Sequence, residues 1–198
     1  MILSCCKMRL IHDIWTGFAR TICHRLGIAD VLQQFLFLDC GLVYKINRVS
    51  KPGFPFWAYQ DFKAFKLFAL DVGLLDAMSG LSAKMILERS RLFEEFKGAL
   101  TEQYVMQQLA VNLENDLFYR SSENGTAEID FLLQNEEGII PVEVKAEENL
   151  QAKSLKLFCE KYHPDKAVRT SMSDYREQDW MVNIPLYLIG IGVNGSHV

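Results

Sequence analysis

The sequence lacks any long hydrophobic run. None of its apolar stretches approaches the roughly 18 uninterrupted residues that a membrane-spanning helix needs. The amino-terminal residues are partly apolar, but Lys7 and Arg9 interrupt them and no small-residue cleavage site follows. We therefore expect a cytoplasmic protein with neither a membrane anchor nor a secretion signal.

Cysteine and histidine are too few and too scattered to build a structural site. The five cysteines are an odd number and contain no C-x-x-C pair, which favours reduced thiols over a disulfide framework or a zinc site. The histidines have no carboxylate or cysteine partner at the spacing of metal ligands. These four residues are His12, His24, His163 and His197.

Two sequence patterns are also missing. No G-x-x-x-x-G-K-[ST] string occurs, so this chain has no loop that would cradle the phosphates of ATP. Internal repeats and low-complexity tracts do not occur either. With 198 residues, about half of them apolar, the chain is long enough for one domain with a real core, or for one domain plus a small module.

Charge is unevenly distributed along the chain. The formal net charge is −4, yet residues 1–60 hold seven basic side chains against three acidic ones. The remainder, residues 61–198, is strongly acidic. This balance argues against strong non-specific affinity for nucleic acid, although a local basic surface could still bind it.

The first 80 residues have an incomplete helix and strand pattern. Residues 8–26 predict a weak helix, and residues 29–40 predict a better one that ends near Gly41. Alternating apolar residues predict a strand over 42–49, turn residues follow at 50–53, and 66–70 predicts a second strand. This order matches the end of a winged helix, so we expect a partial winged-helix-like segment at 28–80. Residues 1–27 have no clear assignment.

Residues 81–198 predict one α/β unit. A short helix that begins with Asp71 is predicted over 71–78, just before this unit. Within the unit, the apolar spacing of 90–115 predicts a long helix. Strands are then expected at 117–120, 128–134 and 139–145, a helix at 151–162, a buried strand at 167–171 and a closing segment at 183–189. The order predicts an α/β fold, namely an α/β/α core with a mixed sheet.

Three charged side chains interrupt two of these apolar strands. Asp130 lies within the first strand, and Glu143 and Lys145 flank Val144 on the next. Because alternate residues of a strand share a face, Glu143 and Lys145 are expected on one face. Glu128 and Asp130 likewise share a face, so the acids of two neighbouring strands can meet.

A magnesium-dependent phosphodiesterase needs this set of groups. Mg²⁺ keeps several waters and binds one or two carboxylates, which Asp130 and Glu143 could supply. Lys145 could then stabilise charge on a phosphate, and Glu102, on the long helix, could hold a metal-bound water or a second metal. We therefore predict a catalytic set of Glu102, Asp130, Glu143 and Lys145, with Mg²⁺ held by Asp130 and Glu143.

A simpler alternative remains for the same residues. Asp130, Glu143 and Lys145 could form a solvated strand face with cross-strand ion pairs, each contributing less than about 1 kcal/mol. Glu128 could be an additional ligand or only an exposed strand charge.

The ordered motifs resemble a known superfamily. Gly98-x-Leu100-x-Glu102, then Ala127-Glu128-Ile129-Asp130-Phe131, then Val142-Glu143-Val144-Lys145 is similar to the PD-(D/E)XK nucleases. The match is closer to the carboxy-terminal domain, of unknown function, found in a large group of prokaryotic AAA-type ATPases. Residues 66–75 and 183–187 also resemble segments of that group, and the resemblance covers about 28–190.

This resemblance implies a restriction-endonuclease-like domain at 81–198 and an associated ATPase module. Because this chain contains no P-loop, we expect a truncated or split family member whose partners are nucleic acid and an ATPase module or subunit. Its phosphodiesterase site could be latent. The alternative is a non-catalytic interaction or DNA-docking module that retains only the fold.

An aromatic-rich segment supports two further interpretations. Basic residues at 45, 48 and 51 lie close in sequence to the aromatic residues Phe35, Phe37, Phe54, Phe56, Trp57 and Tyr59. They could form a basic wing for DNA, or a hydrophobic interface for an ATPase module or a partner subunit.

Overall fold

A computed structural model describes residues 38–79, 84, 88, 91–113, 116–121, 127–136, 138–147 and 152–193. The helix predicted over 8–26, and most of the one predicted over 29–40, lie outside these ranges. The chain forms two compact units. The first contains the residues up to Lys45 together with Lys66–Tyr104, and the second contains Ile46–Phe65 together with Val105–Val198. Within the described residues, no helix is long and apolar enough to cross a membrane.

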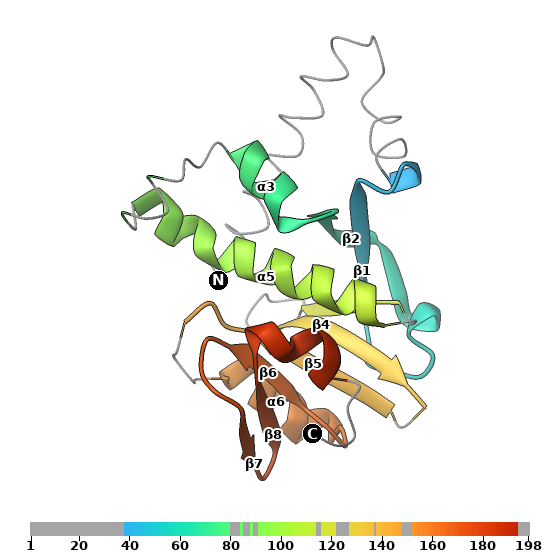
Figure 1. Ribbon diagram of the computed structural model, residues 1–198. Helices are drawn as coiled ribbons and strands as arrows, with labels where there is room; N and C mark the ends of the chain where they lie inside the picture. The colour runs from blue at the N-terminus through green and yellow to red at the C-terminus, as the bar shows by residue number, and fades with distance from the viewer. Residues whose placement is uncertain are drawn as a thin grey trace. The chain divides into compact units, whose positions relative to one another are not determined.

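The strands form one eight-stranded mixed sheet, which confirms the predicted α/β class (Figure 1). Their spatial order is β2-β1-β3-β4-β5-β6-β8-β7. β4 runs antiparallel to β3 and β5, whereas β5, β6 and β8 run parallel to one another. The strands are β1 (Val43–Val49), β2 (Gln60–Ala69), β3 (Phe118–Ser121), β4 (Glu128–Asn135), β5 (Gly138–Val144), β6 (Val168–Ser171), β7 (Arg176–Gln178) and β8 (Met181–Pro185).

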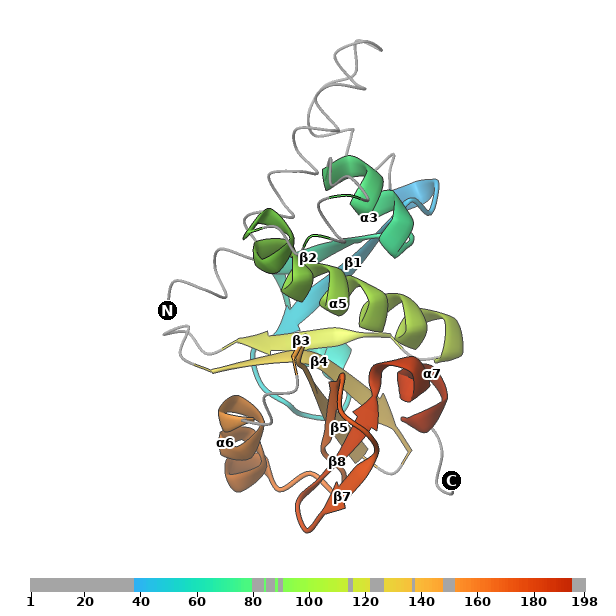
Figure 2. The same ribbon diagram turned by 60° about the vertical axis from the view of Figure 1, so that its left-hand side comes forward.

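Four helices are described, and two of them lie on opposite sides of the second unit's parallel strands. α6 (Lys153–Tyr162) and α7 (Ile189–Gly192) flank β5 and β8 from the two sides (Figure 2). The other two are α3 (Val72–Ser79) and α5 (Arg91–Asn112). The observed order α5, β3, β4, β5, α6, β6 is the order that the sequence predicts.

The first unit is held by a small apolar core and by polar contacts from α5. Val43, Ala69, Leu75 and Ala99 pack together. Gln103 is fully buried, and its side-chain amide bonds both the N–H and the C=O of Ala69, at 2.9 and 2.8 Å. The amide therefore supplies both hydrogen bonds that a neighbouring strand would otherwise make.

α3 begins as its sequence predicts. The Asp71 carboxylate accepts a hydrogen bond from the Leu74 N–H at 2.8 Å, which satisfies one of the unpaired amides of the first turn. Leu75 is the buried residue of this helix and joins the core of the first unit. The cap therefore fixes the start of a helix that contributes one core side chain.

The second unit has a larger apolar core on the α6 side of the sheet. Leu155 and Phe158 of α6 pack with residues of several strands. Those residues are Val49, Phe118, Ile129, Leu132, Ala167 and Met181, together with Phe56 and Ala152. The helix ends at His163, whose left-handed φ of 48° lets its N–H bond the Cys159 carbonyl at 2.9 Å.

Three elements differ clearly from the prediction, beyond shifts of a few residues at element ends. β2 begins at Gln60, six residues before the predicted strand, because the chain turns through a 3-10 helix at Phe56–Tyr59 and pairs at once. The predicted closing segment divides into β8, a 3-10 turn at Leu186–Leu188 and α7. β7 is absent from the prediction.

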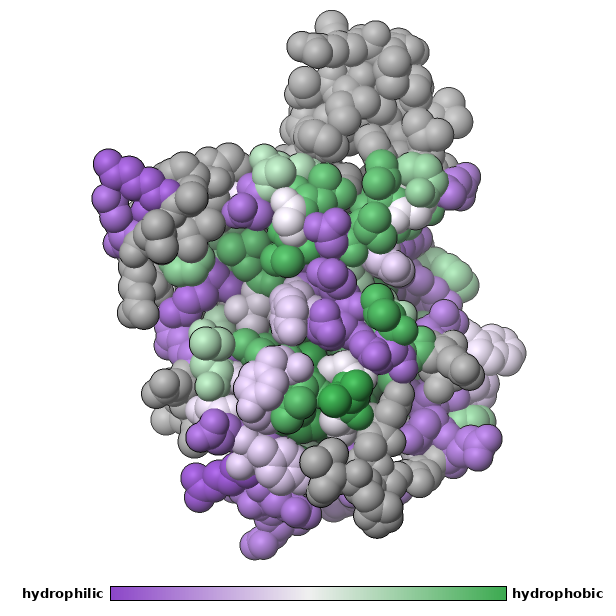
Figure 3. Space-filling view, viewed as in Figure 1, coloured by the Kyte–Doolittle hydropathy of each residue, from purple (hydrophilic) through white to green (hydrophobic). Residues whose placement is uncertain are grey.

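Figure 3 shows one face of the molecule, on which patches of apolar side chains lie among polar ones. The largest exposed fractions among aromatic side chains occur at Phe54, Trp57, Phe62 and Tyr187. All four belong to the second unit.

Candidate functional site

Asp130 lies at the junction of β4 and β5. Phe131 pairs with Val142, so the next positions along these antiparallel strands are Asp130 and Glu143. There the Asp130 carboxylate itself accepts the backbone N–H of Val144, at 2.8 Å. This hydrogen bond fixes one Asp130 oxygen against the Glu143-Val144-Lys145 triplet.

Glu143 is a buried carboxylate with two unlike oxygens. Its side chain retains about 5% exposure. Oε1 forms an ion pair with Lys145 Nζ at 2.7 Å. The two residues are two positions apart, so both side chains lie on one face of the strand. Oε2 is buried and has no hydrogen-bond partner among the described residues. A buried carboxylate oxygen without a partner is costly unless a cation or a proton satisfies it.

Lys145 is positioned by its backbone as well as by its charge. Its N–H donates to the Thr170 carbonyl at 2.9 Å, which continues the pairing of β5 with β6 by one residue. Its side chain is one-third exposed. The ammonium group can therefore hold Glu143 and still be reached by a ligand from solvent.

A row of polar side chains extends from Glu143 across the sheet. Glu143 pairs in register with Arg169 on β6, and Arg169 pairs with Asn183 on β8. Residues in register share a face, so the three side chains are neighbours. Arg169 is 1% exposed and Asn183 is equally buried.

Hydrogen bonds connect this row. Arg169 Nε donates to Asn183 Oδ1 at 2.9 Å, and the Ser171 hydroxyl donates to the same oxygen at 2.8 Å. The Asn183 amide group in turn donates to the carbonyls of Ser173 and Asp174. Asn183 thereby fixes the Arg169 guanidinium at its Nε.

The charge of Arg169 is compensated by Glu143. Burial lowers the pKa of the Arg169 guanidinium, the Glu143 carboxylate opposes that shift, and Arg176 adds to the lowering. An arginine stays protonated in proteins, so the two residues act as a buried pair of opposite charges.

Apolar residues precede the polar row along the parallel strands. Two residues before Arg169 and Asn183, Ala167 and Met181 belong to the apolar cluster under α6. By strand alternation they share a face with the polar row, so this face is apolar under α6 and polar two residues further along the chain. Glu143, the next-to-last residue of β5, lies near the carboxyl end of its strand, where ligands of α/β sheets bind.

The sequence singles out Asp130, Glu143 and Lys145 but not Arg169 and Asn183. One sequence feature could have indicated Arg169. Arg169 is a charge inside Val168-Arg169-Thr170-Ser171, a segment predicted to be a buried strand, and a buried arginine needs an acidic partner. The partner itself is fixed only by the pairing of β5 with β6.

Glu102 lies in the first unit, on α5. Its Oε1 pairs with Lys66 Nζ at 2.7 Å, and both side chains are largely buried. Because Asp130 and Glu143 belong to the second unit, the convergence of Glu102 on them stays a prediction.

The donor set fits a magnesium ion better than a structural metal. No group of three or more His, Cys, Asp or Glu side chains suited to a metal occurs in the described ranges. Magnesium needs only one or two carboxylates and keeps its waters. The buried Oε2 of Glu143 beside Asp130 offers a hard anionic oxygen of this kind. Glu128 is half-buried at the start of β4, and its role as a further ligand stays a prediction.

Comparison with known proteins finds one family that matches part of the chain. A family described as a domain of unknown function (DUF4143) matches residues 97–189. This range contains all four predicted site residues and the polar row. No curated protein and no solved structure matches the chain.

Proposed function

We propose that the DUF4143 domain of this chain carries a divalent-cation site of the PD-(D/E)XK nuclease type, with Asp130 and Glu143 as ligands. The buried and unpartnered Oε2 of Glu143, beside Asp130, carries the proposal. The ordered motifs around Glu102, Asp130 and Glu143-Val144-Lys145 support it.

The residues around these ligands are already held in place. Asp130 is fixed by the Val144 N–H, and Glu143 by Lys145 and by its register partner Arg169. Such fixed groups lose little freedom when a ligand binds, which is the requirement for a preorganised site.

Each side chain has a distinct role in the proposal. Asp130 and Glu143 would hold Mg²⁺, which when bound supplies Lewis-acid chemistry and a water of lowered pKa. Lys145 would contact the phosphate, since its ammonium is reachable from solvent. Arg169, the register partner of Glu143 on β6, would hold that carboxylate in place.

The substrate class in this proposal is a nucleic-acid phosphodiester, and the partner is an ATPase module or subunit. Both follow from the resemblance to the carboxy-terminal domains of prokaryotic AAA-type ATPases. The DUF4143 match at 97–189 supports that relation, because it marks a domain of unknown function in the expected part of the chain.

A cleavage assay tests the proposal. Labelled single- and double-stranded DNA and RNA would be incubated with the full chain in Mg²⁺, in Mn²⁺ and in EDTA. We expect metal-dependent cleavage that falls by about 100-fold or more in Asp130→Asn, Glu143→Gln and Lys145→Met. Glu160→Gln, an exposed acid on α6, is the matched control and should leave the rate unchanged. Cleavage that persists in Asp130→Asn and Glu143→Gln would contradict the assigned site.

A second candidate is a non-catalytic interaction module. Two observations favour it. Glu143 already has cationic neighbours in Lys145 and Arg169, so the site can be stable without a metal. Phe54, Trp57 and Phe62 are exposed, as an interaction surface requires. An inert wild-type protein in every metal condition, with its fold intact, would favour this alternative.

A further inference from the structure

The segment between Lys51 and Lys63 exposes three aromatic rings within nine residues. Phe54, Trp57 and Phe62 are 68%, 70% and 72% exposed. Exposed apolar side chains that gather in one place mark interaction sites. The divalent-cation site proposed above does not employ these rings.

The local structure presents these rings by anchoring the residues between them. Phe56 is buried, its N–H donates to Gln134 Oε1 at 2.8 Å, and its ring meets Phe118 edge-on at 5.4 Å. Trp57, the next residue of the 3-10 turn, is directed away from that core. The rings are therefore exposed by a fixed backbone.

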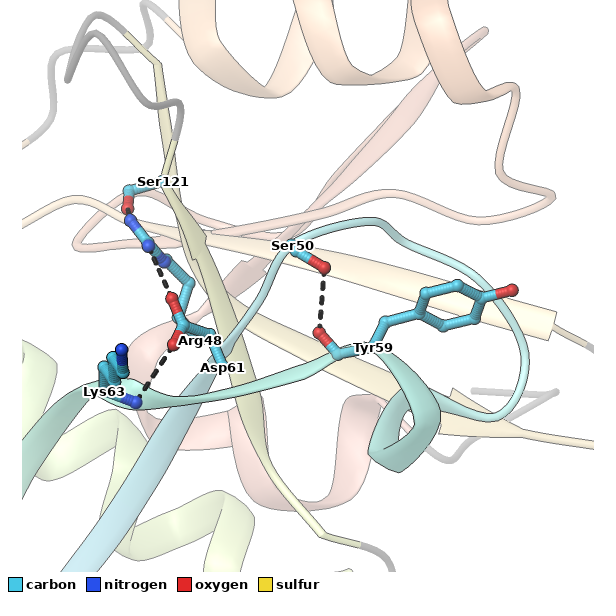
Figure 4. A network of polar contacts seen from close by, with 6 residues as sticks. All are labelled: Arg48, Ser50, Tyr59, Asp61, Lys63 and Ser121. Atoms are coloured by element: carbon cyan, nitrogen blue, oxygen red, sulfur yellow. Dashed lines mark hydrogen bonds and ion pairs between the residues drawn. The ribbon is translucent and has the colours of Figure 1, made fainter.

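The end of the turn is fixed by Ser50. Its N–H donates to the Tyr59 carbonyl at 3.0 Å. Its hydroxyl donates to the same oxygen at 3.1 Å (Figure 4). Downstream, Asp61 turns toward Arg48, and by strand alternation Phe62 points to the opposite face. The third ring is thus also set by the backbone.

The charge around the rings is positive. Residues 46–65 contain Arg48, Lys51 and Lys63 against one acid, Asp61, in a chain whose net charge is −4. Arg48 neutralises that acid through an ion pair at 2.6 Å. Lys51 and Lys63 are exposed, and Lys51 lies 5.8 Å from the Tyr59 ring centre. Two exposed lysines and three exposed rings are thus left within one segment of an acidic protein.

Aromatic rings beside lysines are the groups that bind single-stranded nucleic acid. Bases stack on the rings, while the lysines contact the phosphates. In a duplex the base faces are occupied by their neighbours, so a duplex cannot use these rings. An apolar protein partner would use the rings but gain nothing from the lysines.

We propose that the segment 51–63 binds single-stranded nucleic acid, with bases stacked on Phe54, Trp57 and Phe62 and phosphates contacted by Lys51 and Lys63. This inference rests on the proposed function only for the cleavage of the bound nucleic acid at the Asp130–Glu143 site. Binding itself requires no metal.

Fluorescence anisotropy of a labelled oligothymidylate of about 20 nucleotides tests the inference, with the full chain in EDTA. We expect Trp57→Ala and Phe62→Ala each to weaken binding by about tenfold, and Trp57→Phe to retain most of it. Lys51→Ala should reduce the slope of affinity against salt concentration. Tyr187→Ala, which removes an equally exposed ring elsewhere in the second unit, is the control and should bind as the wild type does.

The outcomes separate this inference from the proposed function. Normal binding by Glu143→Gln, with binding lost in Trp57→Ala, supports the inference even if no cleavage is ever seen. Absence of binding by the wild type, or equal effects of Trp57→Ala and Tyr187→Ala, overturns it. Self-association that is lost in Trp57→Ala, without oligonucleotide binding, would instead mark the segment as an interface between copies and would also overturn it.

Discussion

Arg169 shows how a charge can be accommodated inside this sheet. It is almost wholly buried, with Glu143 in register on one side and Asn183 on the other. Removing one member of a buried charged pair leaves the other uncompensated, and that cost usually exceeds the value of the pair itself. Glu143 and Arg169 therefore depend on each other across two strands.

Replacing Arg169 should destabilise the protein markedly. We expect Arg169→Met to lower the free energy of unfolding by about 3 kcal/mol or more, because Glu143 and Asn183 both lose a buried partner. Urea denaturation followed by circular dichroism measures this. Arg176→Met, on the exposed edge strand β7, should change it by no more than about 0.5 kcal/mol.

The double variant Glu143→Gln/Arg169→Met separates the pair from simple loss of packing. Removing both charges should cost less than the sum of the two single changes. Equal losses from Arg169→Met and Arg176→Met would contradict the coupling of Arg169 to Glu143.

At this scale the sequence predicts residues on one strand well and residues across strands poorly. Alternation alone placed Glu143 and Lys145 on one face, and their ion pair has the expected spacing. Arg169 and Asn183 escaped prediction because their role depends on the register of β5, β6 and β8. Such register links residues that are far apart in sequence.

Among the elements, those with a clear period were predicted and those without one were missed. The apolar spacing of α5, and the change to a period of two at β3, β4 and β5, agree with the structure. β7 consists of Arg176-Glu177-Gln178, which are polar and too few for alternation, so only pairing with β8 defines it.

α7 escaped prediction for a different reason. Gly190 lies so close to α5 that a Cβ there would stand 2.5 Å from the Asn112 side chain. The helix depends on this close approach between distant segments, which no local pattern in the sequence indicates.

The cap of α3 provides a test at the scale of one element. Asp71→Ala removes the acceptor of the Leu74 N–H, so we expect a loss of about 1 kcal/mol in the free energy of unfolding. Chemical denaturation measures it. Asp71→Asn keeps a side-chain oxygen at the same place and should retain most of the stability. An Asp71→Ala protein as stable as the wild type would show that the cap contributes nothing.

For the whole molecule, the sequence predicts the order of helices and strands but not the division of the chain into two compact units. The sequence of helix, three strands, helix and strand indicated the mixed sheet. The structure divides the chain into two units that each combine distant segments, and both β1 and β2 contribute to each of them. The predicted boundaries at 27/28 and 80/81 stay predictions.

The family match adds a second partition of the chain. The matched range, 97–189, runs from within α5, which the two units share, through the site strands of the second unit. The predicted site residues all lie inside this range, and their capacity to bind a metal can be tested directly on the full chain.

Titration of Mn²⁺ into the full chain, followed by calorimetry, tests whether Asp130 and Glu143 bind a divalent cation, because it does not require the site to be active. We expect saturable binding of one ion, weakened by about tenfold or more in Asp130→Asn and in Glu143→Gln and unchanged in Glu160→Gln. Identical titrations for the wild type and for both site variants, whether binding or not, would contradict it.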